Sequence, residues 1–173
     1  MLSSLFWIST AAILHHHVTY PLSLRLLAKP GRVVDLPDNL PEVTIIVPAY
    51  EEEALIASKV KQLADIDYPA GRLTLEIHSD RSTHRTCLIA KKACEASKSN
   101  RRISIVDHAR NRGKIALLNE AIARAKTPIV MLSDTSASFA PDSIKRLAGH
   151  FADPDVAAVG GVYDCQRNGS DGE

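Results

Sequence analysis

Short apolar runs alternate with longer amphipathic stretches from residue 43 onward. Compact runs rich in β-branched and apolar residues predict strands, whereas apolar residues recurring every three or four positions predict helices. The predicted strands are Val43–Val47, Leu73–Ile77, Ile103–Val106, Ile129–Leu132 and Val156–Val159. The predicted helices are Glu52–Ile66, Thr83–Lys98, Gly113–Lys126 and Pro141–Phe151. This alternation indicates an α/β fold with a mostly parallel, doubly wound, Rossmann-like sheet and helices on both faces.

Two of the predicted helices show apolar residues along one face. The expected inward residues are Leu55, Ile56, Val60 and Leu63 in the first helix and Ile115, Leu118, Ala121 and Ile122 in the third. We expect these side chains to pack against the sheet and the opposite faces to be exposed to water.

Three of the predicted strands run into polar residues at their carboxyl ends. The first is followed by Tyr50 and three glutamates, the second by Asp80, and the fourth by Asp134. In an open α/β sheet, ligands bind outside the carboxyl ends of the strands. We therefore expect these three strands to be neighbours, with Ile129–Leu132 at the centre of the sheet and the polar side chains on one rim.

Residues 1–24 contain no Asp, Glu, Lys or Arg, and Arg25, Lys29 and Arg32 follow. Because ~20 apolar residues can cross a bilayer, residues 1–28 are expected to form one transmembrane helix. The basic residues after it place the following domain in the cytoplasm by the positive-inside rule. A signal peptide and a helix lying on the membrane surface are the alternatives, and the missing basic start disfavours the signal peptide.

The rest of the chain reads as a linker, one folded domain and a tail. Residues 29–41 contain three prolines together with Gly31 and Asn39 and predict a linker; residues 42–163 form the domain, and residues 164–173 are a polar tail. A net charge of +1 gives no sign of a polyanionic partner such as a nucleic acid. The three cysteines include no CxxC pair, so neither a zinc site nor a disulfide framework is indicated.

The common nucleotide-binding and hydrolase motifs are absent. No GxGxxG follows a strand, Gly113-Lys114 lacks the rest of a P-loop, and there is no nucleophile elbow. What remains is carboxylates at strand ends, Lys114 in a glycine turn, and the aromatic ring of Tyr50. Carboxylate oxygens hold hard divalent cations, which neutralise a diphosphate, and a lysine adds a positive point charge. This combination suits a nucleotide diphosphate bound without a P-loop.

Five segments, in this order, resemble the family 2 glycosyltransferases. They are VTIIVPAYEEEALI, LEIHSDRSTHRT, NRGKIALLNEAI, IVMLSDTSASFAPDSI and VAAVGG. They cover roughly residues 43–161 and are similar to the nucleotide-sugar half of the family's GT-A-type fold, so the domain is expected to be truncated. The resemblance implies the N-terminal part of a membrane-bound inverting enzyme. Its expected donor is a nucleotide-diphosphate sugar, specifically a UDP-sugar; the acceptor is a glycan or lipid, and the cofactor is Mg²⁺ or Mn²⁺.

The resemblance also implies roles for individual residues. The nucleotide-sugar residues are Pro48, Ala49, Tyr50, Glu52, Asp80, Lys114 and Asp134, and the metal ligands are Asp134 and Ser136. Within this set, Asp80 is expected at the base or ribose and Lys114 near the diphosphate. The family's catalytic base comes from the half that follows, so it is expected beyond Glu173.

Four positions depart from the family pattern. The family usually has Asn at Glu51, Gly at Arg81, Asp at His84, and Asp or Asn at Ser136. A hydroxyl is a weaker metal ligand than a carboxylate, and an arginine lacks the backbone freedom of glycine. These departures leave two alternatives open: a non-catalytic nucleotide-binding module, and an α/β domain that binds no ligand.

Overall fold

The computed structural model describes residues 2–28, 36, 39–81, 84–97, 99 and 101–162. It divides the chain into two compact units, Met1–Val33 and Val34–Glu173. The predicted tail 164–173 lies outside the described residues, and so does most of the predicted linker, of which only residue 36 and residues 39–41 are described.

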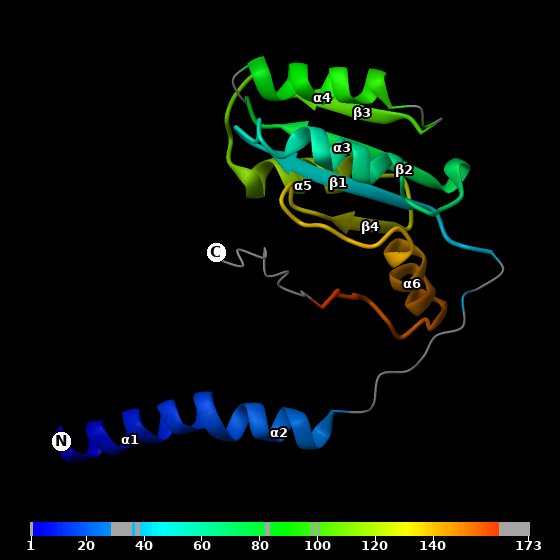
Figure 1. The fold of residues 1–173 in the computed structure, drawn as a ribbon. Helices are drawn as coiled ribbons and strands as arrows, with labels where there is room; N and C mark the ends of the chain where they lie inside the picture. The colour runs from blue at the N-terminus through cyan, green and yellow to red at the C-terminus, as the bar shows by residue number, and fades with distance from the viewer. Residues whose placement is uncertain are drawn as a thin grey trace, which may run out of the picture. The chain divides into compact units, whose positions relative to one another are not determined.

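Four parallel strands form the sheet, in the order β3-β2-β1-β4 (Figure 1). They are β1 (Val43–Ala49), β2 (Leu73–Ser79), β3 (Ile103–Asp107) and β4 (Ile129–Leu132). Val43 of β1 pairs with Leu73 on one side and Ile129 on the other. The prediction of a parallel α/β sheet is therefore confirmed, and the three strands expected to be neighbours are neighbours.

Two details of the predicted sheet are wrong for the described part of the chain. The central position belongs to β1 and β2, and β4 lies at an edge. Val156–Val159, predicted as a strand, forms none; instead the Val156 N–H closes a turn by donating to the carbonyl of Asp153 at 3.1 Å. An apolar run becomes a strand only where a neighbour pairs its backbone, and the sequence alone does not show that neighbour.

Helices follow the strands in the predicted order. They are α3 (Ile56–Ala64), α4 (His84–Ala96), α5 (Lys114–Arg124) and α6 (Ser143–Gly149), with 3₁₀ turns at Ala70–Arg72 and His150–Ala152. The first predicted helix begins later than expected, because residues 52–55 form turns instead. The start predicted at Thr83 for the second lies outside the described residues.

Helices cover both faces of the sheet (Figure 1). On one face, the alternating residues Val43, Ile45 and Val47 of β1 share a core with side chains of α3 and α6. Ile46 points to the other face, where α5 contacts β1, and it is fully buried. A strand buried on both faces reads as a continuous apolar run, which is why β1 was predictable.

The buried face of α5 agrees with the predicted one only in part. Ala121 is buried as predicted and Leu117 is buried as well, whereas Ile115 is 77% exposed and Ile122 is 41% exposed. In α3 the predicted face holds except at Leu55, which precedes the helix and is exposed. A helix with apolar residues on two sides does not reveal from sequence which side meets the sheet.

The N-terminal unit is helical from residue 2 to residue 27. It consists of α1 (Leu2–Leu14), a π-helical turn at His15–Thr19 and α2 (Tyr20–Leu27), and none of their residues is buried. In the part of the chain that the structure describes, no helix combines the length and the apolar character needed to cross a membrane. The single transmembrane helix predicted over residues 1–28 is therefore not found among the described residues.

Candidate functional site

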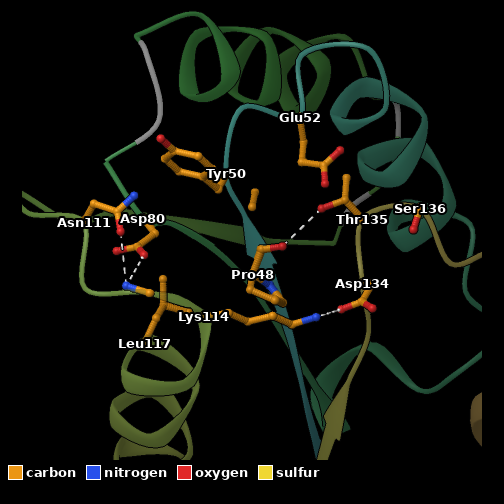
Figure 2. Close-up of a pocket in the computed structure, with 12 residues that line it drawn as sticks. Pro48, Tyr50, Glu52, Asp80, Asn111, Lys114, Leu117, Asp134, Thr135 and Ser136 are labelled. Atoms are coloured by element: carbon orange, nitrogen blue, oxygen red, sulfur yellow. Dashed lines mark hydrogen bonds and ion pairs between the residues drawn. The ribbon is translucent and has the colours of Figure 1, made fainter.

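A pocket with a cavity of about 390 Å³ opens at the carboxyl ends of the strands (Figure 2). It is lined by Pro48, Ala49, Tyr50, Glu52, Asp80, Asn111, Gly113, Lys114, Leu117, Asp134, Thr135 and Ser136. The chain passes from β1 to β2 on one side, and β4 adds to the other side of β1. The pocket thus lies at the point where the strand order reverses, which is where open α/β sheets bind ligands.

Every nucleotide-sugar and metal residue predicted from the sequence lines this pocket. The structure therefore brings them together, while their individual roles stay predictions. Four further lining residues were not predicted: Asn111, Gly113, Leu117 and Thr135. The segment Asn111-Arg112-Gly113-Lys114 carried the signal for two of them, because its glycine marks a turn directly before a helix.

Asp80 fixes the turn that presents Lys114. Its carboxylate is buried and accepts the backbone N–H of Arg112 at 3.0 Å and that of Gly113 at 2.8 Å. Gly113 adopts a φ of 81°, in the region that favours glycine, and α5 begins at the next residue. Each oxygen of the Asp80 carboxylate is therefore already bonded to the backbone of this turn, and the residue also lines the pocket.

An ion pair joins α5 to the loop after β4 (Figure 2). Lys114 Nζ lies 2.6 Å from Asp134 Oδ1, and the two side chains are 57% and 51% exposed. An ion pair this exposed is worth only about 0 to 1 kcal/mol, because water screens it. Both groups are therefore available to a ligand at little cost: the ammonium to an anion and the carboxylate to a cation.

The loop after β4 is hydrogen-bonded to a buried lysine that was not predicted from the sequence. Lys59 of α3 is 2% exposed, and its Nζ donates to Ser133 Oγ at 2.8 Å and to the carbonyl of Ala137 at 2.7 Å. Burial lowers the pKa of Lys59 to about 8, and the negative charge of Asp134 opposes that shift. The available signal was its spacing: Lys59 occupies a position on the apolar stripe of α3, beside Val60.

Two histidines beside the pocket, His78 and His108, belong to one chain of hydrogen bonds. Arg112 donates to His108 Nδ1 at 3.0 Å, and because arginine only donates, His108 carries its proton on Nε2. His108 Nε2 then donates to His78 Nδ1 at 3.1 Å, and His78 Nε2 donates to Glu76 at 2.8 Å. This chain accounts for both rings as structural groups that tie the Arg112 turn to β2.

Two departures from the family pattern fall where the backbone is left-handed. Glu51 has a φ of 54° and Arg81 a φ of 52°. These are the positions at which the family usually has Asn and Gly, the residues that adopt such angles most readily. A longer side chain there strains the backbone next to the pocket.

Replacing Arg81 with glycine should therefore raise the free energy of unfolding by about 1 kcal/mol, because the left-handed conformation costs other residues roughly 1–2 kcal/mol. The matched control is Arg85→Gly, in the right-handed helix α4, which should lower stability by about 1 kcal/mol. Urea denaturation followed by circular dichroism measures both. A neutral or destabilising Arg81→Gly would contradict the strain.

Comparison with known proteins places the chain in a family. The family model for glycosyl transferase family 2 matches residues 44–172. A beta-monoglucosyldiacylglycerol synthase from Synechocystis sp. is 32% identical over 121 residues, 69% of this chain and 25% of that protein. An N-acetylglucosaminyltransferase from Bradyrhizobium elkanii is 31% identical over 170 residues, 97% of this chain and 88% of that sequence. The chain thus spans about a quarter of the length of the synthase.

A solved structure supports the same assignment. A mannosyltransferase from Pyrobaculum calidifontis, in complex with GDP-Man and Mn²⁺, superimposes with a TM-score of 0.71 and 31% identity. The match covers 84% of this chain and 44% of that one. The parallel sheet, the family match and the relatives agree, and the chain belongs to glycosyl transferase family 2 and carries a glycosyltransferase domain.

Proposed function

We propose that the pocket binds a nucleotide-diphosphate sugar, with a UDP-sugar as the expected donor, and that the domain is the donor-binding part of an inverting glycosyltransferase. The observation that carries the proposal is the exposed Lys114–Asp134 pair at the strand-order switch point. It offers a positive and a negative group side by side, as a diphosphate with its counter-cation requires. The mannosyltransferase bound to GDP-Man, 31% identical to this chain, supports the same ligand class.

The two sides of the pocket suit the two ends of such a ligand. Tyr50 is 51% exposed and offers a ring on which a base can stack. Pro48 and Ala49 continue that wall, and Asp80 lies beside the turn of Gly113. We assign the nucleoside to this side and the diphosphate to the side where Lys114 and Asp134 meet.

The residues present fit a divalent cation that is shared with the ligand. Among the described residues no group of three or more His, Cys, Asp or Glu side chains could hold a metal ion by itself. Mg²⁺ in nucleotide sites is commonly bound by one or two carboxylates together with substrate phosphates and water. Asp134, with the Ser136 hydroxyl, is such a donor set for Mg²⁺ or Mn²⁺. The cation would supply charge neutralisation for the departing diphosphate.

The transfer itself has a simple balance. The oxygen of an acceptor hydroxyl forms a bond to the anomeric carbon, the bond from that carbon to the diphosphate breaks, and a base takes the hydroxyl proton. The relative named beta-monoglucosyldiacylglycerol synthase supports a lipid as acceptor, and a glycan is the alternative that the family resemblance offers. We assign no described residue as the base; Lys114 and Asp134 position the donor.

Isothermal calorimetry on the full chain tests the proposed ligand. UDP should bind, Mn²⁺ should strengthen the binding, and UMP should bind more weakly because it lacks the second phosphate. Lys114→Ala should weaken UDP more than UMP, whereas Lys145→Ala, which removes an ion-paired lysine outside the pocket, should change neither. If GDP binds and UDP does not, the donor is a GDP-sugar and not a UDP-sugar. If neither nucleotide binds, the proposed function is overturned.

We further propose that residues 1–28 attach the protein to a membrane and that the domain lies in the cytoplasm. The support is an uncharged stretch to residue 24 whose large apolar side chains are exposed, including Phe6, Trp7 and Ile8. Removing residues 1–41 should release the protein from the membrane fraction to the soluble fraction after centrifugation. Full-length protein that stays soluble without detergent and does not float with lipid vesicles would contradict this attachment.

A further inference from the structure

We propose that Lys59 is a positioning residue for the loop of residues 133–139, called here the Asp134 loop. Its buried ammonium holds this loop, and with it the carboxylate of Asp134, in the arrangement that receives a cation-bound diphosphate. The identity of the ligand rests on the proposed function, but the contacts between Lys59 and the loop do not depend on it.

The ammonium group of Lys59 is fully used. Its three contacts are Gln62 Oε1 at 3.0 Å, Ser133 Oγ at 2.8 Å and the carbonyl of Ala137 at 2.7 Å. An ammonium has three N–H donors, so each has an acceptor. Nζ also lies 4.6 Å from the centre of the Phe139 ring, a distance at which a cation is attracted to the ring face. The loop is thus bound on both sides of Asp134, once before it and twice after it.

Neutral hydrogen bonds complete the attachment. They are Ser133 N–H to the Ile46 carbonyl at 3.1 Å, Thr135 Oγ1 to the Pro48 carbonyl at 3.1 Å, and Gln62 Nε2 to Ser138 Oγ at 2.8 Å. The first two fasten the loop to β1, and the third fastens it to α3. Lys59 likewise joins the loop to α3, because it projects from α3 to Ser133, the residue that directly follows β4.

A lysine at this place needs an explanation. Burying a charge is costly unless it is paired and hydrogen-bonded, and the lowered pKa of Lys59 reflects that cost. A methionine of similar length would fill the same space of the apolar stripe without it. What the ammonium adds is two hydrogen bonds to the loop, at Ser133 and Ala137, and a positive charge that interacts with the carboxylate of Asp134.

Hydrogen exchange on the ligand-free protein tests the loop contacts directly. In Lys59→Met, the backbone amides of residues 133–137 should exchange about tenfold faster or more, because the charged hydrogen bonds are lost. Lys61→Met, an exposed lysine on the same helix, should leave them unchanged. Ser133→Ala, which removes one acceptor, should give a smaller increase and decides the case if Lys59→Met does not fold. Unchanged exchange in the variants that fold would overturn the proposal.

Calorimetry tests the consequence for ligand binding. In Lys59→Met the gain in UDP affinity given by Mn²⁺ should fall about 10- to 100-fold, as when a residue supporting a metal ligand is lost. UDP binding without metal should be kept, because the Tyr50 side of the pocket is untouched. If UDP affinity falls equally with and without Mn²⁺ and the melting temperature falls too, Lys59 has only a structural role. If the parent protein binds no nucleotide, the proposed function fails while the exchange experiment still decides the role of Lys59.

Discussion

Replacing Asp134 with alanine should abolish the gain in UDP affinity that Mn²⁺ provides and should slightly strengthen UDP binding without metal. The carboxylate of Asp134 is the charged member of the proposed donor set, so without it the cation keeps only the weaker Ser136 hydroxyl as a protein ligand. A contact between unit charges at about 4 Å is worth between about 1 and about 4 kcal/mol, depending on exposure to water. For a half-exposed site we expect a loss on the order of 10- to 100-fold. UDP affinity without metal should rise because Lys114 is released from its 2.6 Å ion pair and can contact the phosphates.

The matched control for this change is Asp67→Ala. Asp67 pairs with Lys145 at the same distance, 2.6 Å, and its side chain is 63% exposed, but the pair lies outside the pocket. Calorimetric titrations of UDP with and without Mn²⁺ should give parental values for this variant. If Asp134→Ala keeps the Mn²⁺ effect, the cation is held elsewhere; if Asp67→Ala loses it, the effect is a general one of surface charge.

Much of the fold and pocket could be predicted because its determinants are local in sequence. β1 is apolar except for Thr44 and is followed at once by the segment Tyr50-Glu51-Glu52. The carboxyl ends of parallel neighbours share one rim, so a strand assignment also places Asp80 and Asp134. Three short stretches far apart in the chain thus defined one pocket before any contact was known.

The features that could not be predicted depend on distant contacts or on backbone angles. Lys59 meets Ser133, a partner 74 residues away, and by sequence alone a lysine in an amphipathic helix reads as a solvated side chain. The strain at Glu51 and Arg81 depends on the backbone angle φ, which cannot be predicted from these residue types. The π-helical turn at His15–Thr19 likewise lies within a segment that by composition alone predicts one regular α-helix.

Replacing Asp80 with alanine should cost both stability and nucleotide affinity. Its carboxylate accepts two backbone N–H groups, those of Arg112 and Gly113, at 3.0 and 2.8 Å. Hydrogen bonds to a charged group contribute about 1.5–3 kcal/mol each, and because Arg112 and Gly113 are exposed, water recovers part of that loss. We expect a decrease of about 2–4 kcal/mol in the free energy of unfolding. The affinity falls because the released turn no longer fixes Lys114.

Two further variants separate the charge of Asp80 from the geometry of its oxygens. Asp80→Asn keeps one oxygen acceptor and should lose roughly half as much stability as the alanine variant. Asp153→Ala removes a carboxylate that accepts the N–H of Asp155 at 3.0 Å outside the pocket, and it should leave UDP binding unchanged. Urea denaturation and calorimetry on the same samples give both quantities. Parental stability and affinity in Asp80→Ala would mean that the turn of Gly113 holds Lys114 without the carboxylate, and that Asp80 does not contribute to nucleotide binding.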